Sequence, residues 1–168
     1  MRYGQLRKYD IANGPGIRTS VFVTGCRRHC KGCFNPEYQD FNAGKLPDWE
    51  FFKRLHEYLA NPNVSGLSIL GGEPFEPENF WLVLNAIGTA KLYRKFVWIY
   101  SGFTFEELLK DEKKALILKL CDVLVDGPFM EALKNPSLRF RGSSNQRIID
   151  VQKSLKAGKV ILWRENDV

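Results

Sequence analysis

The chain has 168 residues, of which 44% are hydrophobic and 26% are charged, and its formal net charge is +6. This composition is typical of a globular domain and excludes a disordered or collagen-like chain. A chain of this length buries roughly 70% of its unfolded surface and needs no disulfides for stability. Residues 1–168 are therefore predicted to form a single domain.

The sequence also argues against membrane and nucleic-acid partners. No apolar run approaches the roughly 20 residues of a membrane-spanning helix, and the first five residues begin no signal peptide. We therefore expect a cytoplasmic protein. The basic residues form short clusters, such as Arg27, Arg28 and Lys31, rather than the basic face of a nucleic-acid-binding protein.

Short apolar runs alternate with helical patterns along the chain. We expect strands at residues 20–24, 66–70, 96–100, 122–126 and 146–151, with a small final strand at 160–163. We expect helices after Asp48 through Leu59, at 77–95, 104–109 and 113–120, and a short one at 129–134. Strands that alternate with helices form βαβ units, which build a mainly parallel sheet.

A polar segment with glycine follows each of the first four predicted strands. These segments begin with Gly25, Gly71, Ser101 and Asp126. β/α barrels carry their chemistry at this end of their strands, but five strands cannot close an eight-stranded barrel. The predicted fold class is therefore α/β, a partial, open (β/α) barrel of about five parallel strands. Its missing side would admit a large substrate.

Three of the four cysteines are clustered with the spacing C-x3-C-x2-C, at Cys26, Cys30 and Cys33. A structural zinc site almost always has four protein ligands. Three thiolates can instead hold three irons of a 4Fe–4S cluster, which leaves the fourth iron for the amino and carboxylate groups of S-adenosylmethionine. We predict these cysteines as the metal ligands. A zinc-binding interaction module, with His29 as the fourth ligand, remains an alternative.

The segment Gly71-Gly72-Glu73 fits the same scheme. Two glycines let the backbone approach a ligand closely, and a neighbouring carboxylate can accept a hydrogen bond from an ammonium group. By itself, Gly-Gly is also typical of an ordinary turn between a strand and a helix. Its place one strand after the cysteines favours the functional interpretation.

These motifs resemble those of radical S-adenosylmethionine enzymes. The resemblance is closest to the activating proteins of anaerobic ribonucleoside-triphosphate reductase, and it runs from near residue 10 to near residue 150. The matching stretches are Asn13–Gly16, Phe22–Cys33, Gly71–Pro74, Val123–Gly127, Pro136–Leu138 and Arg141–Gln146.

The resemblance implies a radical-SAM type fold and an activase. A reduced 4Fe–4S cluster would cleave S-adenosylmethionine, and the 5′-deoxyadenosyl radical would generate a glycyl radical on anaerobic ribonucleoside-triphosphate reductase. Backbone contacts to the adenosine would come from Gly32, Cys33, Phe34 and Asn35, and the methionine amino group would be held by Gly71, Gly72 and Glu73.

The resemblance leaves two matters open. The activase of another glycyl-radical enzyme, such as pyruvate formate-lyase, remains an alternative. The electron donor is expected to be an acidic flavodoxin or ferredoxin, which the basic cysteine loop would attract.

The sequence departs from the family pattern at three positions. The family often has aspartate where this chain has Glu73, which keeps the carboxylate. Phe34 stands where tyrosine or histidine is common, which keeps an aromatic face without the polar contact. The segment at 100–103, which begins with Tyr100, replaces a more usual Trp-Thr-Gly-Tyr.

Three further residues admit two interpretations each, and a fourth is expected to be structural. Asp126 is either a turn or cap residue or a carboxylate in the wall of the site. Arg141 and Asn145 belong either to a solvated turn or, as the resemblance favours, to a site for S-adenosylmethionine or the reductase. Cys121 is expected to be buried as a small hydrophobic residue.

Overall fold

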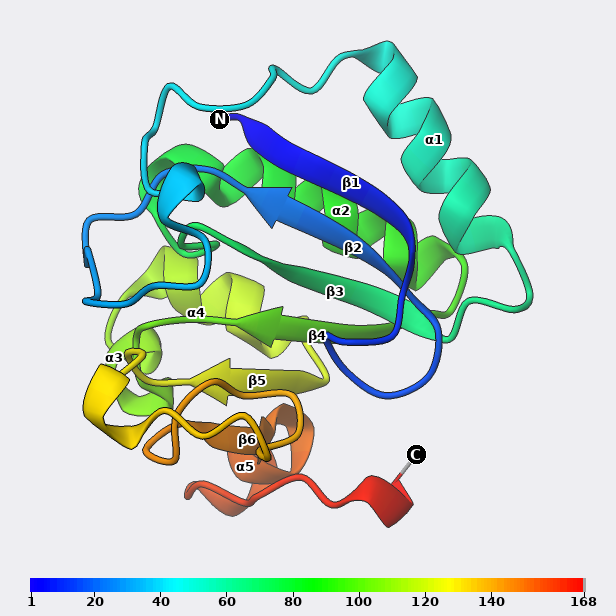
Figure 1. Cartoon of the computed structure of the whole chain (residues 1–168). Helices are drawn as coiled ribbons and strands as arrows, with labels where there is room; N and C mark the ends of the chain where they lie inside the picture. Colours follow the sequence, from blue (N-terminus) through cyan, green and yellow to red (C-terminus); the bar gives the residue numbers. More distant parts are fainter. Residues whose placement is uncertain (168) are drawn as a thin grey trace.

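The computed structural model describes residues 1–167, which form one mixed sheet with helices packed against it (Figure 1). Neighbours in the chain are also neighbours in the sheet. The six strands within the described residues are β1 (Tyr3–Asp10), β2 (Arg18–Val23), β3 (Gly66–Gly71), β4 (Phe96–Tyr100), β5 (Val123–Asp126) and β6 (Arg147–Asp150).

The helices of the described residues connect or flank these strands. The α-helices are α1 (Trp49–Ala60), α2 (Phe80–Leu92), α3 (Phe105–Leu109), α4 (Glu112–Lys119) and α5 (Val151–Ala157). The 3-10 helices are η1 (Pro36–Tyr38), η2 (Pro77–Asn79), η3 (Glu131–Leu133) and η4 (Glu165–Asp167). None of the helices in residues 1–167 is long and apolar enough to cross a lipid bilayer.

The α/β class is confirmed, but the strand directions differ from the prediction. Strands β2 to β5 are parallel, whereas β1 pairs antiparallel with β2, and β6 pairs antiparallel with β5. The prediction of about five parallel strands was therefore wrong, because the fifth predicted strand, at 146–151, runs the other way. The sheet is open, and no closed barrel forms within the described residues.

The connections explain the two antiparallel edges. Two neighbouring strands can be parallel only if a crossover connection of a dozen or more residues joins them, and this connection usually contains an α-helix. Residues 11–17 instead form a short loop that returns the chain beside β1, and residues 127–146 contain only the 3-10 helix η3. The chain therefore turns back at both edges, and no helix carries it across the sheet.

The two faces of the sheet have different roles. Alternate strand residues point to opposite faces, so Val21, Ile69 and Ile99 belong to the core beneath the helices. Phe22 and Tyr100 point to the other face, where they line a cavity. In Figure 1, α2 and α4 lie behind the sheet, while the segment from β5 to β6 (yellow to orange) crosses in front.

Several local predictions need correction. Strand β1 was not predicted, because charged residues interrupt its alternation, and α5 was missed because its first residue was assigned to the preceding strand. The helix expected at 129–134 is only the 3-10 turn η3, and the strand expected at 160–163 is a single bridge between Ile149 and Leu162. The predicted cap at Asp48 is confirmed, since its side chain accepts from the Phe51 N–H at 2.9 Å.

Candidate functional site

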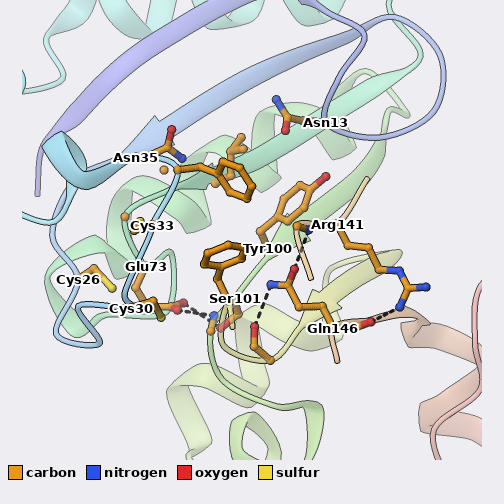
Figure 2. Close-up of a pocket in the computed structure, with 18 of the residues that line it drawn as sticks. Asn13, Cys26, Cys30, Cys33, Asn35, Glu73, Tyr100, Ser101, Arg141 and Gln146 are labelled. Carbon is orange, nitrogen blue, oxygen red and sulfur yellow. Dashed lines mark hydrogen bonds between the residues drawn. The ribbon is translucent and has the colours of Figure 1, made fainter. Parts of the chain in front are cut away.

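A cavity of about 580 Å³ lies on the face of the sheet that the helices leave uncovered. It includes the carboxyl ends of the four parallel strands, as expected for this arrangement. Figure 2 shows the three clustered cysteines at one end, with Glu73 and Ser101 near them, and Asn13, Arg141 and Gln146 at the other end.

The cysteine loop follows β2. Its three cysteines are free and half-buried, and all three line the cavity. The loop is anchored at its start, where the Cys26 N–H donates to Gln39 O at 3.0 Å. The Cys33 N–H donates to Cys30 O at 3.2 Å, which forms the turn that brings these two cysteines together.

Backbone hydrogen bonds join this loop to the Gly-Gly-Glu segment after β3. The Gly72 N–H donates to Val23 O at 2.8 Å, and the Glu73 N–H donates to Gly25 O at 2.8 Å. The buried Asn79 amide donates to both Thr24 O and Glu73 O at 3.0 Å. The two motifs, separated by about forty residues of sequence, are therefore joined by a network of hydrogen bonds.

The Glu73 carboxylate is buried and hydrogen-bonded within the protein. It accepts from the Phe75 N–H at 3.0 Å, the Ser101 hydroxyl at 2.9 Å and the Gly102 N–H at 2.8 Å. Burial raises the pKa of Glu73 to about 7, while these three donors act to lower it. Glu73 therefore fixes the loop after β4 against the Gly-Gly turn.

This arrangement predicts that Glu73→Gln destabilises the protein. A glutamine has one acceptor oxygen in place of two and would point an NH₂ group at a backbone donor, which costs about 1–3 kcal/mol. Urea denaturation measures the change. The control Glu78→Gln disrupts an exposed pair with Arg27 and should cost at most about 1 kcal/mol. Equal losses in both variants would contradict the role assigned to Glu73.

Two arginines beside the cysteines have different surroundings. Arg27 is paired with Glu76 at 2.5 Å and Glu78 at 2.5 Å. Arg28 stacks over Phe103, with its guanidinium carbon 4.3 Å from the ring centroid, and lies 3.5 Å from Glu107. The Nε of Arg28 is buried and has no hydrogen-bond partner among the described residues.

These residues fit an iron–sulfur cluster and an anionic ligand. Three free thiols and a buried cationic donor without an acceptor line the same cavity. Cysteine binds metal as the thiolate, and burial raises the pKa of the Cys26 thiol. The cluster sulfides or the carboxylate of a bound ligand would supply an acceptor for the Nε of Arg28.

The geometry gives no support to a zinc site built on His29. Within residues 1–167, no three His, Cys, Asp or Glu side chains are grouped so that they could hold one metal ion. In a 4Fe–4S cluster, by contrast, each thiolate binds a separate iron. His29 is exposed, and its Nδ1 lies 3.1 Å from Gln39 Oε1.

The structure brings most of the predicted site residues to the cavity. Gly32 and Asn145 do not line it, whereas the following do: Cys26, Cys30, Cys33, Phe34, Asn35, Gly71, Gly72, Glu73 and Arg141. Asp126 does not line the cavity; its carboxylate accepts from the N–H of Phe105, the first residue of α3, at 2.8 Å and pairs with Arg147 at 2.6 Å. Cys121 is fully buried, as expected.

Three residues that shape the site were not recognised from the sequence. Glu76 holds the cysteine loop by accepting from the Arg27 N–H at 2.9 Å, and Asn79 binds the two motifs together. Both lie within eight residues of Gly71-Gly72, so their proximity to that motif was an available signal. Tyr100 lines the cavity, which follows from its being the last residue of β4 on the uncovered face.

Comparisons with known proteins match almost the whole chain. Residues 12–149 match the family described as "4Fe-4S single cluster domain". The anaerobic ribonucleoside-triphosphate reductase-activating protein of Vibrio cholerae is 36% identical over 152 residues, which cover 88% of this chain and 97% of the relative. The protein of that name from Escherichia coli K12 is 36% identical over 154 residues (87% and 96%), and that from Enterobacteria phage T4 is 34% identical over 150 residues (88% and 93%).

The relatives are 34–36% identical to this chain, and each alignment covers nearly the full length of both proteins. They agree with the motifs quoted from the sequence and with the cavity that those motifs line. The chain belongs to the family of anaerobic ribonucleoside-triphosphate reductase-activating proteins, with a 4Fe–4S single cluster domain.

Proposed function

We propose that the protein is a radical S-adenosylmethionine enzyme that generates a glycyl radical on anaerobic ribonucleoside-triphosphate reductase. When bound, a reduced 4Fe–4S cluster would supply the electron that cleaves S-adenosylmethionine into methionine and a 5′-deoxyadenosyl radical, and that radical would take a hydrogen atom from a glycine of the reductase. The reductase as target is carried over from the names of the relatives.

One observation carries the proposal. The cysteine loop and the Gly-Gly-Glu segment line a single cavity and are hydrogen-bonded to each other. If the cysteines held only a structural metal ion, the Gly-Gly-Glu segment would not be needed beside them. The family match to a 4Fe–4S domain supports the same interpretation.

The residues that line the cavity would have different roles in binding the cluster and the cofactor. Cys26, Cys30 and Cys33 would hold three irons. Gly71 and Gly72 line the cavity and would lie at the methionine end of the cofactor. Their lack of a Cβ lets the turn after β3 pack directly against the backbone of β2 and of the cysteine loop. Glu73 would act by holding the turn after β3 and the loop after β4 together, since its carboxylate already accepts three hydrogen bonds from the protein.

The adenosine end of the cofactor meets an aromatic wall. The rings of Phe34 and Phe129 have centroids 4.9 Å apart and both line the cavity. Cys33, Phe34 and Asn35 also line it, whereas Gly32 does not. The proposed backbone contacts to adenosine therefore come from residues 33–35.

The direct test is electron paramagnetic resonance of the anaerobically reconstituted, reduced protein. We expect a 4Fe–4S signal that changes when S-adenosylmethionine is added, because the cofactor would bind the open iron. Adding the reductase should then give an organic radical signal on the reductase. A cluster spectrum unchanged by S-adenosylmethionine, or a colourless preparation with stoichiometric zinc, would defeat the proposal.

The same assay separates the alternative substrates. Mixing the protein with pyruvate formate-lyase in place of the reductase tests the second activase candidate. The electron donor is proposed to be a flavodoxin or ferredoxin. All three basic residues of the cysteine loop already have acidic neighbours. Arg27 pairs with two glutamates, Arg28 lies 3.5 Å from Glu107, and Lys31 lies 3.6 Å from Glu131. The attraction for an acidic donor is thereby smaller than the sequence indicates.

A further inference from the structure

Arg28 is the basic residue of the cysteine loop that lies in the wall of the cavity. It lines the cavity together with the three clustered cysteines, and it stands between Cys26 and Cys30 in the sequence. Its side chain is 25% exposed, whereas those of Arg27 and Lys31 are 57% and 91% exposed, and neither of these two residues lines the cavity. The charge of Arg28 is therefore the least screened by water of the three.

The protein holds the Arg28 side chain in one place. Its guanidinium carbon lies 4.3 Å from the centroid of the Phe103 ring. Its stem occupies the space that Gly102 leaves, because a Cβ on that glycine would lie 2.4 Å from the Arg28 Cδ. The Gly102 N–H in turn donates to Glu73 at 2.8 Å. The loop after β4, which Glu73 joins to the Gly-Gly turn, thereby fixes the position of the guanidinium.

Two carboxylates lie near Arg28, and neither satisfies it fully. The Arg28 Nη2 lies 3.5 Å from Glu107 Oε2, which already accepts from the Thr104 N–H and belongs to a side chain that is 51% exposed. Arg28 also acts to lower the pKa of Glu73, whose oxygens already accept three hydrogen bonds. The buried Nε of Arg28 has no hydrogen-bond partner among the described residues. A buried cationic donor without an acceptor is costly, so the site suits a further negative charge in the cavity.

We propose that Arg28 raises the reduction potential of the 4Fe–4S cluster. This inference rests on the cluster that belongs to the proposed function. Reduction transfers one electron from the flavodoxin or ferredoxin donor to the cluster, and it adds one negative charge without a proton or a change of bonds. A fixed cation stabilises the more negative state more strongly. Arginine stays charged in proteins, so Arg28 favours the reduced cluster, the form that would cleave S-adenosylmethionine.

The variant Arg28→Gln removes this charge and keeps a polar side chain. An anaerobic redox titration of the reconstituted protein, followed by the paramagnetic signal of the reduced cluster, measures the potential without S-adenosylmethionine or the reductase. At a fixed solution potential, the ratio of reduced to oxidised cluster should fall about tenfold, which corresponds to about 59 mV for a one-electron couple. Arg28→Lys keeps the charge, so its ratio should stay within about threefold of that of the unmodified protein.

Lys31→Gln is the matched control. It removes one positive charge from the same loop at a position that is 91% exposed. Water screens that charge, so the ratio should change by less than about twofold.

Three results would overturn the inference. The first is an unchanged potential in Arg28→Gln. The second is an equal shift in Lys31→Gln or in Arg28→Lys, which would show an effect of net charge or of side-chain shape. The third is loss of the cluster in Arg28→Gln, which would assign Arg28 to assembly of the site. If the unmodified protein assembles no 4Fe–4S cluster, the proposed function itself fails.

Discussion

Replacing Cys30 by alanine is expected to abolish the iron–sulfur cluster and to lower radical formation on the reductase by at least about 100-fold. Loss of a residue that only supports a metal ligand already costs about 10–100-fold, and Cys30 is proposed as a ligand itself. Cys30 lies between the other two cysteines and accepts the backbone hydrogen bond from Cys33 that shapes the loop. Iron content, visible absorbance and the paramagnetic signal measure the loss.

Cys121→Ala provides the control for this substitution. Cys121 is fully buried away from the cavity, and its thiol donates to Ile117 O at 3.3 Å. The variant should lose about 1–2 kcal/mol of stability through the small void it leaves, and it should keep the full cluster. If Cys30→Ala retained a normal cluster, or if Cys121→Ala lost it, the proposed ligand set would be wrong.

The second large effect is expected for Gly72→Ala. A Cβ at this position would lie 2.6 Å from both Gly25 O and Tyr38 O, which are backbone atoms that cannot rotate away. The junction between the two motifs would have to open, at a cost of about 2–3 kcal/mol. Because the same junction positions the cysteine loop, cluster reconstitution should also fall. Urea denaturation and iron content measure the two effects.

Gly88→Ala separates this packing effect from the general effect of replacing glycine. Gly88 lies in α2, is exposed, and a Cβ there would meet no atom within 4 Å. Alanine in a helix interior is about 1 kcal/mol more favourable than glycine, so this variant should be more stable. Equal behaviour of the two variants would contradict the close backbone approach at Gly72.

The sequence was most informative where residues typical of a functional site directly follow a predicted strand. The β-branched and apolar runs at 66–70 and 96–100 predicted β3 and β4, and the polar segments after them predicted the edge of the sheet at which the cavity lies. The quoted motifs, above all the run Arg141–Gln146 together with the short chain length, predicted the family that the comparisons then showed. These signals are local, so they can be read without the fold.

The sequence was less informative where long-range contacts decide the structure. The direction of β6 depends on how residues 127–146 return, and no pattern in that segment reports it. The functional alternative for Asp126 was weakened by its pairing with Arg147, a contact that only the antiparallel edge creates. The buried hydroxyl of Tyr100 has no sequence signal, because its lack of a partner is a property of the assembled cavity.

The one-sided packing of the sheet has a consequence for control of the reaction. The helices cover one face of the sheet and leave the cavity on the other face without such a cover. If the proposed function holds, a primary carbon radical formed in this cavity would be exposed to quenching by small molecules from the solvent. The docked partner would complete the enclosure, and productive turnover would thereby depend on assembly of the two proteins.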